Sequence, residues 1–475
     1  MKEVSYGSSP KSGHDQARAV VESEKCRSCF VRRLGLSTLQ AGLLAIAFII
    51  LWRRYSPCGA PRSVGAHDKP QWSTSIPEML RYKPQYKDCP SISTTQSWQS
   101  GYNISTDSDV TVWRLNDSST SSQQRVLQGQ ISILRGNASQ QSDIEVHVIS
   151  QSSDEEELRN ITFEISETSL DINYIPSENG NSCTDIKVLV YLRPEPKKLL
   201  DTFAIWSENL DIWFYHKLNW DIKHLHTHTT HGDSTFEANG WEEEVVVHNI
   251  YASVGTGTMF GYYVAHGNIT LKSDSGSIGI FYVPNYGAYY RPESLTVVSN
   301  SGSIHIQASV EYWTAFALTH STKVHSTSGD IESQTVHGRY TNISTESGNI
   351  DAYILPFGLP TSETLSEIYT RSNAGDVDFW IEESWQQSLN GTYDPMLNSI
   401  SDHSVQDGKM TLRYPYSWYG SMEGRIDSGE LKFDSSNLED LDRGEGYVKA
   451  KRGTRGKSKA EAWVGTGALD IRLGL

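Results

Sequence analysis

The chain has 475 residues, of which 37% are hydrophobic and 10% aromatic, and its formal net charge is −16. This length allows a sizeable core, and the acidic balance makes nucleic acid a poor partner. Ser, Thr, Asn and Gly are abundant, and long amphipathic helical patterns are nearly absent. The composition therefore favours an all-β protein.

The N-terminal part predicts a membrane anchor. Residues 1–33 are polar and lack periodicity, which is typical of a disordered tail. Residues 34–52 carry no charge over 19 positions, about the length of a transmembrane helix. A cleaved signal peptide is the alternative, but 33 residues precede the stretch and no small-residue cleavage site follows it. We therefore expect a retained signal anchor, as in a single-pass type II membrane protein.

The flanking sequence indicates the orientation of this anchor. Basic residues precede it, so residues 1–33 are expected to be cytosolic. Residues 53–107 are rich in Pro, Ser, Thr and Gln and predict a polar stalk. We therefore expect an ectodomain that is extracellular or lies in the lumen of the secretory pathway. Seven N-glycosylation sequons agree with this, because all of them follow the anchor, at Asn103, Asn116, Asn137, Asn160, Asn268, Asn342 and Asn390.

Three cysteines lie on the expected oxidising side of the membrane. A disulfide between Cys89 and Cys183 would tie the stalk to the β-rich region and leave Cys58 spare. Three cysteines leave their own pairing open, so this disulfide is a hypothesis.

Alternating apolar residues begin at about residue 108. Segments such as "VTVWRL", "GQISILRG" and "SDIEVHVIS" are separated by polar insertions, a spacing typical of a meander or sandwich. We therefore expect residues 108–216 to form an antiparallel β front.

A short phrase recurs in the remainder of the chain. "SDSGSIGI" (273–280) returns as "SNSGSIHI" (299–306) and then in three looser copies, always with a β-branched residue two positions after the glycine. The five glycines are 26, 27, 19 and 27 residues apart, which is typical of stacked repeats. We expect residues 217–475 to form a β-solenoid or β-roll. Its structural turns would lie at Gly276, Gly302, Gly329, Gly348 and Gly375, with weaker copies at Gly429 and Gly467.

The order of these pieces resembles the putative-adhesin β-solenoid family of bacteria and of fungal membrane-anchored proteins. The matching segments are "GQISILRG" (129–136), "STSGDIES" (326–333) and "YPYSWYGSMEGRIDSGELKF" (414–433). The resemblance covers most of the chain after residue 108, and the anchor, stalk and sequons suggest a fungal member. It implies a β-solenoid and brings no catalytic residue and no cofactor.

Two segments are candidate binding sites. In "HLHTHTTH", His224, His226 and His228 would project from one face of a strand and could bind Zn²⁺ or Cu²⁺; an exposed polar strand is the alternative. In "FYVPNYGAYYRPE" (281–293), aromatic rings in a loop between two coils could stack on sugars or could brace the coils instead. The predicted ligand-binding residues there are Tyr282, Tyr286, Tyr289 and Tyr290, beside Phe281.

The sequence favours a membrane-anchored, non-enzymatic, adhesin-like module with a binding or structural role. Its expected partners are the membrane and either cell-wall polysaccharide or a surface protein. The alternative is a carbohydrate-active β-helix enzyme, a lyase or hydrolase, which needs carboxylates that converge on a cleft. The candidate carboxylates are Asp376 with Asp378, expected on one strand face, and the run Glu242 to Glu244.

Overall fold

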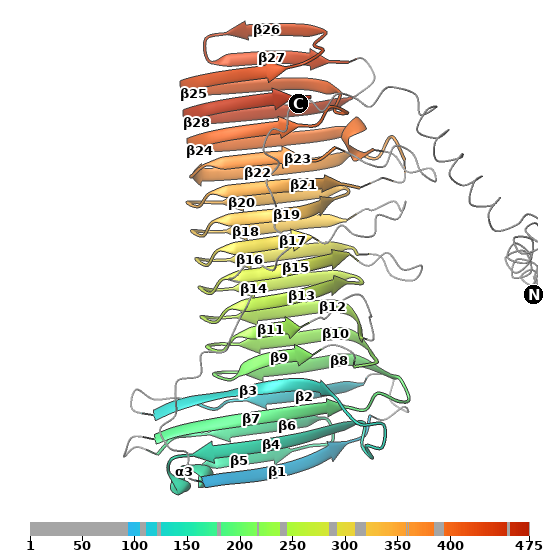
Figure 1. Ribbon diagram of the computed structural model, residues 1–475, viewed down its shortest axis with the longest axis vertical. Helices are drawn as coiled ribbons and strands as arrows, with labels where there is room; N and C mark the ends of the chain where they lie inside the picture. The colour runs from blue at the N-terminus through green and yellow to red at the C-terminus, as the bar shows by residue number, and fades with distance from the viewer. Residues whose placement is uncertain are drawn as a thin grey trace, which may run out of the picture. The chain divides into compact units, whose positions relative to one another are not determined.

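The computed structural model describes residues 94–104, 111–120, 125–177, 182–215, 218–237, 245–284, 292–308, 320–357, 359, 361–383, 394–453 and 457–474 (Figure 1). They all belong to the second of two units, Met1–Thr74 and Ser75–Leu475. In these ranges the chain is nearly all β, with one short helix, α3 (Glu155–Arg159), and one 3₁₀ turn, η2 (Pro395–Leu397). No helix among them is long and apolar enough to cross a membrane. The predicted tail, the predicted anchor and residues 53–93 of the predicted stalk lie outside the described residues.

The front of the β-region mixes parallel and antiparallel pairs. Strands β1 and β7 pair antiparallel with β4, and β5 pairs antiparallel with β6. However, β2 pairs parallel with β6 and β8, and β3 pairs parallel with β7 and β9. The expected purely antiparallel front is therefore wrong for β2 and β3, because both already belong to the parallel ladders that follow. The strands of the front are β1 (Thr94–Tyr102), β2 (Val112–Asp117), β3 (Arg125–Arg135), β4 (Ile144–Ser152), β5 (Ile161–Ile165), β6 (Ser169–Tyr174) and β7 (Ser182–Leu192).

Two boundaries differ from the prediction. Strand β1 begins at Thr94, inside the predicted stalk, because its sequence TTQSWQSGY is almost entirely polar and gives no hydrophobic alternation. Parallel pairing also begins before residue 217, since β8 and β9 already pair parallel with the front.

The rest of the region forms two parallel ladders, which together we call the parallel stack. In each ladder a strand pairs with the next strand but one along the chain, so even-numbered and odd-numbered strands separate (Figure 1). The even ladder contains β8 (Lys198–Ser207), β10 (Trp220–Thr229), β12 (Val245–Val254), β14 (Asn268–Ser273), β16 (Ser294–Ser299), β18 (Ser321–Ser326), β20 (Tyr340–Thr345) and β22 (Ser366–Ala374). The odd ladder contains β9 (Asp211–Tyr215), β11 (Ser234–Glu237), β13 (Met259–Ala265), β15 (Ile278–Pro284), β17 (Ile304–Ala308), β19 (Ile331–His337), β21 (Ile350–Pro356) and β23 (Val377–Ile381).

The repeated phrase forms the corner between an even strand and the next odd strand. At three of the corners a Ser or Thr three residues before the glycine accepts a hydrogen bond from the glycine N–H: Ser299 from Gly302 at 2.8 Å, Ser326 from Gly329 and Thr345 from Gly348. A Cβ built on Gly302 would lie 2.0 Å from the carbonyl oxygen of Gly276 in the previous coil, so only glycine fits there. Equivalent contacts occur at the other predicted corners, Gly276, Gly329, Gly348, Gly375, Gly429 and Gly467.

The β-branched residue after each corner lies in the core. Ile278, Ile304, Ile331 and Ile350 are paired in register along the odd ladder and are each about 1% exposed. Burial of such a side chain contributes roughly 1.5–3 kcal/mol to the free energy of unfolding. The column therefore holds successive coils together, and the residues that alternate with it point outward.

The C-terminal part departs from the simple order. Three strands of 16 residues, β24 (Ser399–Tyr414), β25 (Gly420–Ser435) and β28 (Ser458–Leu473), each extend across both ladders. The last of them, β28, lies between β24 and β25. The stacking order of the glycines is therefore Gly408, Gly467 and Gly429, and the corner at Gly408 was not predicted. Strands β26 (Asp440–Gly444) and β27 (Tyr447–Arg452) add antiparallel pairs beside β25.

Candidate functional site

A hollow of about 1080 Å³ lies on the outer side of the front. It is open to solvent, and its walls are mostly amides, hydroxyls and backbone rather than apolar side chains. We call it the front hollow. It is lined by Gln99, Ser100, Gly101, Arg135, Gly136, Asn137, Ser139, Gln140, Gln141, Ser142, Glu145, His147 and Tyr191.

The floor of the front hollow is the outward face of three neighbouring strands. Gln99 of β1 is paired with His147 of β4, and the next outward row joins Glu145 of β4 to Tyr191 of β7. The rings of His147 and Tyr191 meet edge to face, with centroids 5.1 Å apart. Strand alternation explains this floor, because the intervening residues, such as Val146, point into the core.

The wall of the front hollow is the loop 136–142 between β3 and β4. Gln140 is buried and donates hydrogen bonds to the carbonyl oxygens of Ser142 and Tyr191, each at 3.0 Å. Asn137 accepts a hydrogen bond from the N–H of Ser139 at 3.0 Å. A Cβ on Gly136 would lie 1.8 Å from Oε1 of Gln140, so a larger residue there would force the Gln140 amide to shift. The loop is therefore held in place by its own polar groups.

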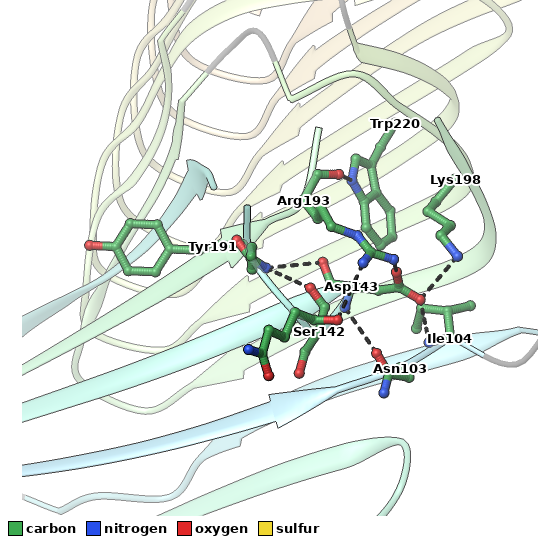
Figure 2. A network of polar contacts seen from close by, with 10 residues as sticks. Asn103, Ile104, Ser142, Asp143, Tyr191, Arg193, Lys198 and Trp220 are labelled. Atoms are coloured by element: carbon green, nitrogen blue, oxygen red, sulfur yellow. Dashed lines mark hydrogen bonds and ion pairs between the residues drawn. The ribbon is translucent and has the colours of Figure 1, made fainter. Parts of the chain in front are cut away.

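The base of this loop rests on a buried carboxylate (Figure 2). Asp143 is 2% exposed and forms ion pairs with Arg193 and, at 3.1 Å, with Nζ of Lys198. It also accepts a hydrogen bond from the N–H of Ile104 at 2.9 Å. Two cations and a backbone donor thus compensate the desolvation of this carboxylate.

The same network connects the front to the parallel stack. Arg193 follows β7, and its carbonyl oxygen accepts a hydrogen bond from Nε1 of Trp220 in β10 at 2.9 Å. Lys198 begins β8, and Asn103, just after β1, accepts a hydrogen bond from the N–H of Asp143 at 3.3 Å. Figure 2 shows these side chains converging on Asp143 from separate segments. The wall of the front hollow is therefore fixed to several strands that are distant in sequence.

The chemistry of the front hollow suits a hydroxyl-rich ligand. Amide side chains both donate and accept hydrogen bonds, and the hydroxyl groups of a sugar need both. The Tyr191 ring offers an aromatic edge and face of the kind on which sugar rings pack. No single residue pattern predicted this site, since its lining comes from β1, β3, β4, β7 and a loop; "GQISILRG" marks only one edge of it.

The predicted aromatic platform is only partly within the described residues. Tyr282 is 0% exposed, and its ring packs on His320 with centroids 5.5 Å apart. Its predicted role as a sugar-binding residue is therefore wrong, because β15 alternates and turns Tyr282 into the core. Phe281 points the other way and stacks on Tyr262 at 4.6 Å. The remaining predicted residues, Tyr286, Tyr289 and Tyr290, lie outside the described residues.

The histidine tract lies on β10. His224, His226 and His228 are half-buried on its outward face, as the alternation predicts, and the rings of His224 and His226 are 6.4 Å apart. Nδ1 of His228 is instead hydrogen bonded to Oγ of Ser253 at 2.8 Å. Across the part of the chain that the structure describes, no three His, Cys, Asp or Glu side chains are grouped to hold a metal ion. Burial and the neighbouring His224 lower the pKa of His226.

A row of carboxylates crosses the odd ladder. Glu332, Asp351 and Asp378 are paired in register on β19, β21 and β23. Burial first, then Asp378 and Glu332, raise the pKa of Asp351 to about 6. Arg413 on β24 pairs with Asp378 at 3.2 Å. We call these three carboxylates the acidic row; the sequence singled out only Asp378, because register across strands is invisible in a linear reading.

The other predicted carboxylates are placed differently. Asp376 lies in the corner before β23, where its carboxylate accepts a hydrogen bond from the N–H of Lys409 at 2.8 Å. The run Glu242 to Glu244 lies outside the described residues. Neither the front hollow nor a smaller hollow of about 460 Å³ beside β2, β6 and β8 includes a member of the acidic row.

The sequons differ in accessibility. Asn103 and Asn137 are exposed beside the front hollow. Asn116 donates a hydrogen bond to Asp171 at 3.1 Å, and Asn268 donates one to Glu293 at 2.8 Å. These two are half-buried, as are Asn160 and Asn342, whereas Asn390 lies outside the described residues.

Cys183 is disulfide-bonded and lies near the start of β7. The other four cysteines, Cys89 among them, lie outside the described residues. The pairing of Cys183 with Cys89 therefore remains a prediction.

No family model and no curated protein matches the sequence. Solved structures are similar at low identity. A "putative cell adhesion protein" from Clostridium sporogenes is 11% identical and has a TM-score of 0.18, with 80% of this chain and 100% of that chain covered. A "putative adhesin" from Parabacteroides merdae is 11% identical with a TM-score of 0.31, covering 68% and 96%. A "putative lipid binding protein" from Parabacteroides distasonis is 11% identical with a TM-score of 0.24, covering 68% and 97%. At TM-scores this low the likeness carries no argument about function.

Proposed function

We propose that this chain is a membrane-anchored β-solenoid that acts as a non-enzymatic, adhesin-like module, and that its front hollow binds cell-wall glycan. The observation that carries the proposal is the front hollow itself, an open polar surface with an aromatic ring on its floor. Its loop wall is held by a buried ion-pair network, and a pre-ordered wall lowers the entropic cost of binding.

The proposal places the hollow outside the cell or in the secretory-pathway lumen. Residues 34–52 would be the transmembrane anchor, residues 1–33 would be cytosolic, and the seven sequons would face the glycosylation machinery. Protease added to sealed microsomes, whose cytosolic face is outward, tests this part: an N-terminal epitope should be digested and the C-terminal region should be protected. Digestion of the C-terminal region in intact microsomes would contradict the proposed orientation.

The binding part is tested by sedimentation of the full-length protein, in detergent, with insoluble fungal cell wall. We expect Tyr191→Ala and Gln99→Ala each to lower the bound fraction severalfold, because they remove the aromatic ring and an exposed amide of the floor. Tyr447→Ala on β27 is the matched control, since it removes a ring far from the front hollow in sequence and leaves the lining unchanged.

Asn137 must be tested by a separate variant, because it lines the front hollow and a glycan attached to it would cover the hollow. The Asn137→Gln variant should bind at least as well as the unmodified chain. Equal binding by the unmodified chain and by the Tyr191→Ala and Gln99→Ala variants would contradict the front hollow as the site.

A second candidate is the carbohydrate-active enzyme, and the acidic row is the observation that favours it. Burial and two neighbouring carboxylates raise the pKa of Asp351, whereas Asp378 is paired with Arg413. Such a pair could divide general-acid and general-base roles. The test is release of reducing ends or of unsaturated products from a panel of cell-wall polysaccharides. Activity that Asp351→Asn abolishes would favour the enzyme over the adhesin-like module.

A further inference from the structure

The outward face of the even ladder carries three exposed cations that belong neither to the front hollow nor to the acidic row. Lys272 on β14, Lys323 on β18 and Arg371 on β22 are all exposed. The register places Lys272 and Arg371 in one row and Lys323 two residues away in the neighbouring row. None of the three forms an ion pair with a carboxylate of the described residues, although the chain has 57 acidic against 41 basic residues. We call this surface the cationic face.

Aromatic rings alternate with these cations. Nζ of Lys272 lies over the ring of Tyr251 at 5.5 Å, and Nζ of Lys323 lies over the ring of Tyr340 at 5.7 Å. The ring of Tyr340 is in turn 5.8 Å from the ring of Tyr369. The cationic face therefore combines positive charge with ring surfaces that are partly open to solvent.

The spacing of the cations is regular along the ladder. Each cation is separated from the next by one strand without a cation, β16 and then β20. Neighbouring strands of a sheet are about 4.8 Å apart, so the cations recur at about 10 Å along the stack. That interval is close to the length of one disaccharide unit of an extended polysaccharide.

We propose that the cationic face binds a linear acidic polysaccharide that carries one anionic group per disaccharide. Lys272, Lys323 and Arg371 would pair with successive anionic groups, and Tyr251, Tyr340 and Tyr369 would pack against the sugar rings between them. The charges agree with this partner, because the even strands from β12 to β22 hold a single carboxylate among their described outward residues. That carboxylate is Glu367, which accepts a hydrogen bond from the hydroxyl of Tyr369 at 2.9 Å. The proposal is independent of the front hollow.

Hyaluronate is the probe, because it carries one carboxylate per disaccharide; dextran is the neutral control. The full-length protein is produced without N-glycans, since Asn342 lies within the cationic face. Binding is measured by fluorescence anisotropy of labelled hyaluronate at two salt concentrations. We expect binding that weakens with salt and no binding of dextran. Absence of hyaluronate binding would overturn the proposal.

A triple variant locates the site. Lys272→Gln, Lys323→Gln and Arg371→Gln together should weaken hyaluronate binding about tenfold or more, since three of the paired charges are lost. The matched control removes three exposed lysines near the C-terminus, by Lys432→Gln, Lys449→Gln and Lys451→Gln, and changes the net charge equally. An equal loss in both triple variants would show a non-specific effect of net charge and overturn the cationic face as the site.

Discussion

The two ladders of the parallel stack both turn apolar side chains inward, but their outward faces carry charges of opposite sign. The even ladder carries the cationic face, with Lys272, Lys323 and Arg371, whereas the odd ladder carries the acidic row at matching depth in the stack. The inward positions of both are apolar because they share one core. The comparison teaches that the repeat constrains the inward residues and the corners, while the outward rows are free to take charge of either sign.

The largest expected effect comes from breaking the corner on which both faces depend. Gly302→Val places a side chain against the backbone of the previous coil, where a Cβ would already lie 2.0 Å from a carbonyl oxygen. We expect a loss of roughly 4 kcal/mol or more in the free energy of unfolding, or failure to fold. Thermal and urea unfolding measure it. Ser301→Ala, in the same corner but exposed, is the control and should change little.

The next effect concerns the core that both ladders share. Burial lowers the pKa of four core histidines, to about 4 for His266 and His320 and about 3 for His337 and His403. In the unfolded chain these groups titrate near 6.5, so below that pH the unfolded state binds more protons than the folded state. Stability should therefore fall as the pH decreases from 7 to 5, by roughly 2 kcal/mol for each histidine.

His403→Gln isolates one of these contributions, because burial is the sole cause of its lowered pKa. The variant should lose about 2 kcal/mol less than the unmodified chain between pH 7 and pH 5. Urea unfolding at both pH values measures the difference. The same pH slope in both proteins would contradict the prediction, whatever the stability of the variant at pH 7.

A smaller effect distinguishes the acidic row from the cationic face. Burial and the neighbouring carboxylates raise the pKa of Asp351 to about 6, so its ionised form opposes folding above that pH. Asp351→Asn should therefore stabilise the protein at pH 7, by about 1 kcal/mol after allowance for solvent screening. The gain should shrink as the pH falls from 6 towards 4. Urea midpoints along this pH series test it, and a loss of stability at pH 7 would contradict it.

The smallest effect is on the cationic face. Lys323→Gln removes a cation over the ring of Tyr340, an exposed contact that contributes roughly 0.5 kcal/mol. We expect a decrease in the urea midpoint near the limit of detection, with the same sign at pH 5 and pH 7. A stabilisation as large as that of Asp351→Asn would mean that the cationic face is under like-charge strain, contrary to the comparison.

Several features of the fold could be predicted from the sequence. The Ser and Gly of each repeated phrase and the β-branched residue two positions later predict a corner followed by a buried strand, because turn chemistry and strand alternation are local properties. The same alternation placed His224, His226 and His228 on one face. Strand alternation also turns Tyr282 inward, but the sequence predicted a loop rather than a strand from residue 281.

Only the tertiary structure decided the rest. The insertion of β28 between β24 and β25, the acidic row and the cationic face all depend on which strands become neighbours and in what register. The front hollow likewise joins Gln99, His147 and Tyr191 through two antiparallel pairings. Local propensity does not determine these pairings, because burial of the shared core selects the register. A shift of the register by one residue would turn every outward side chain of a strand inward.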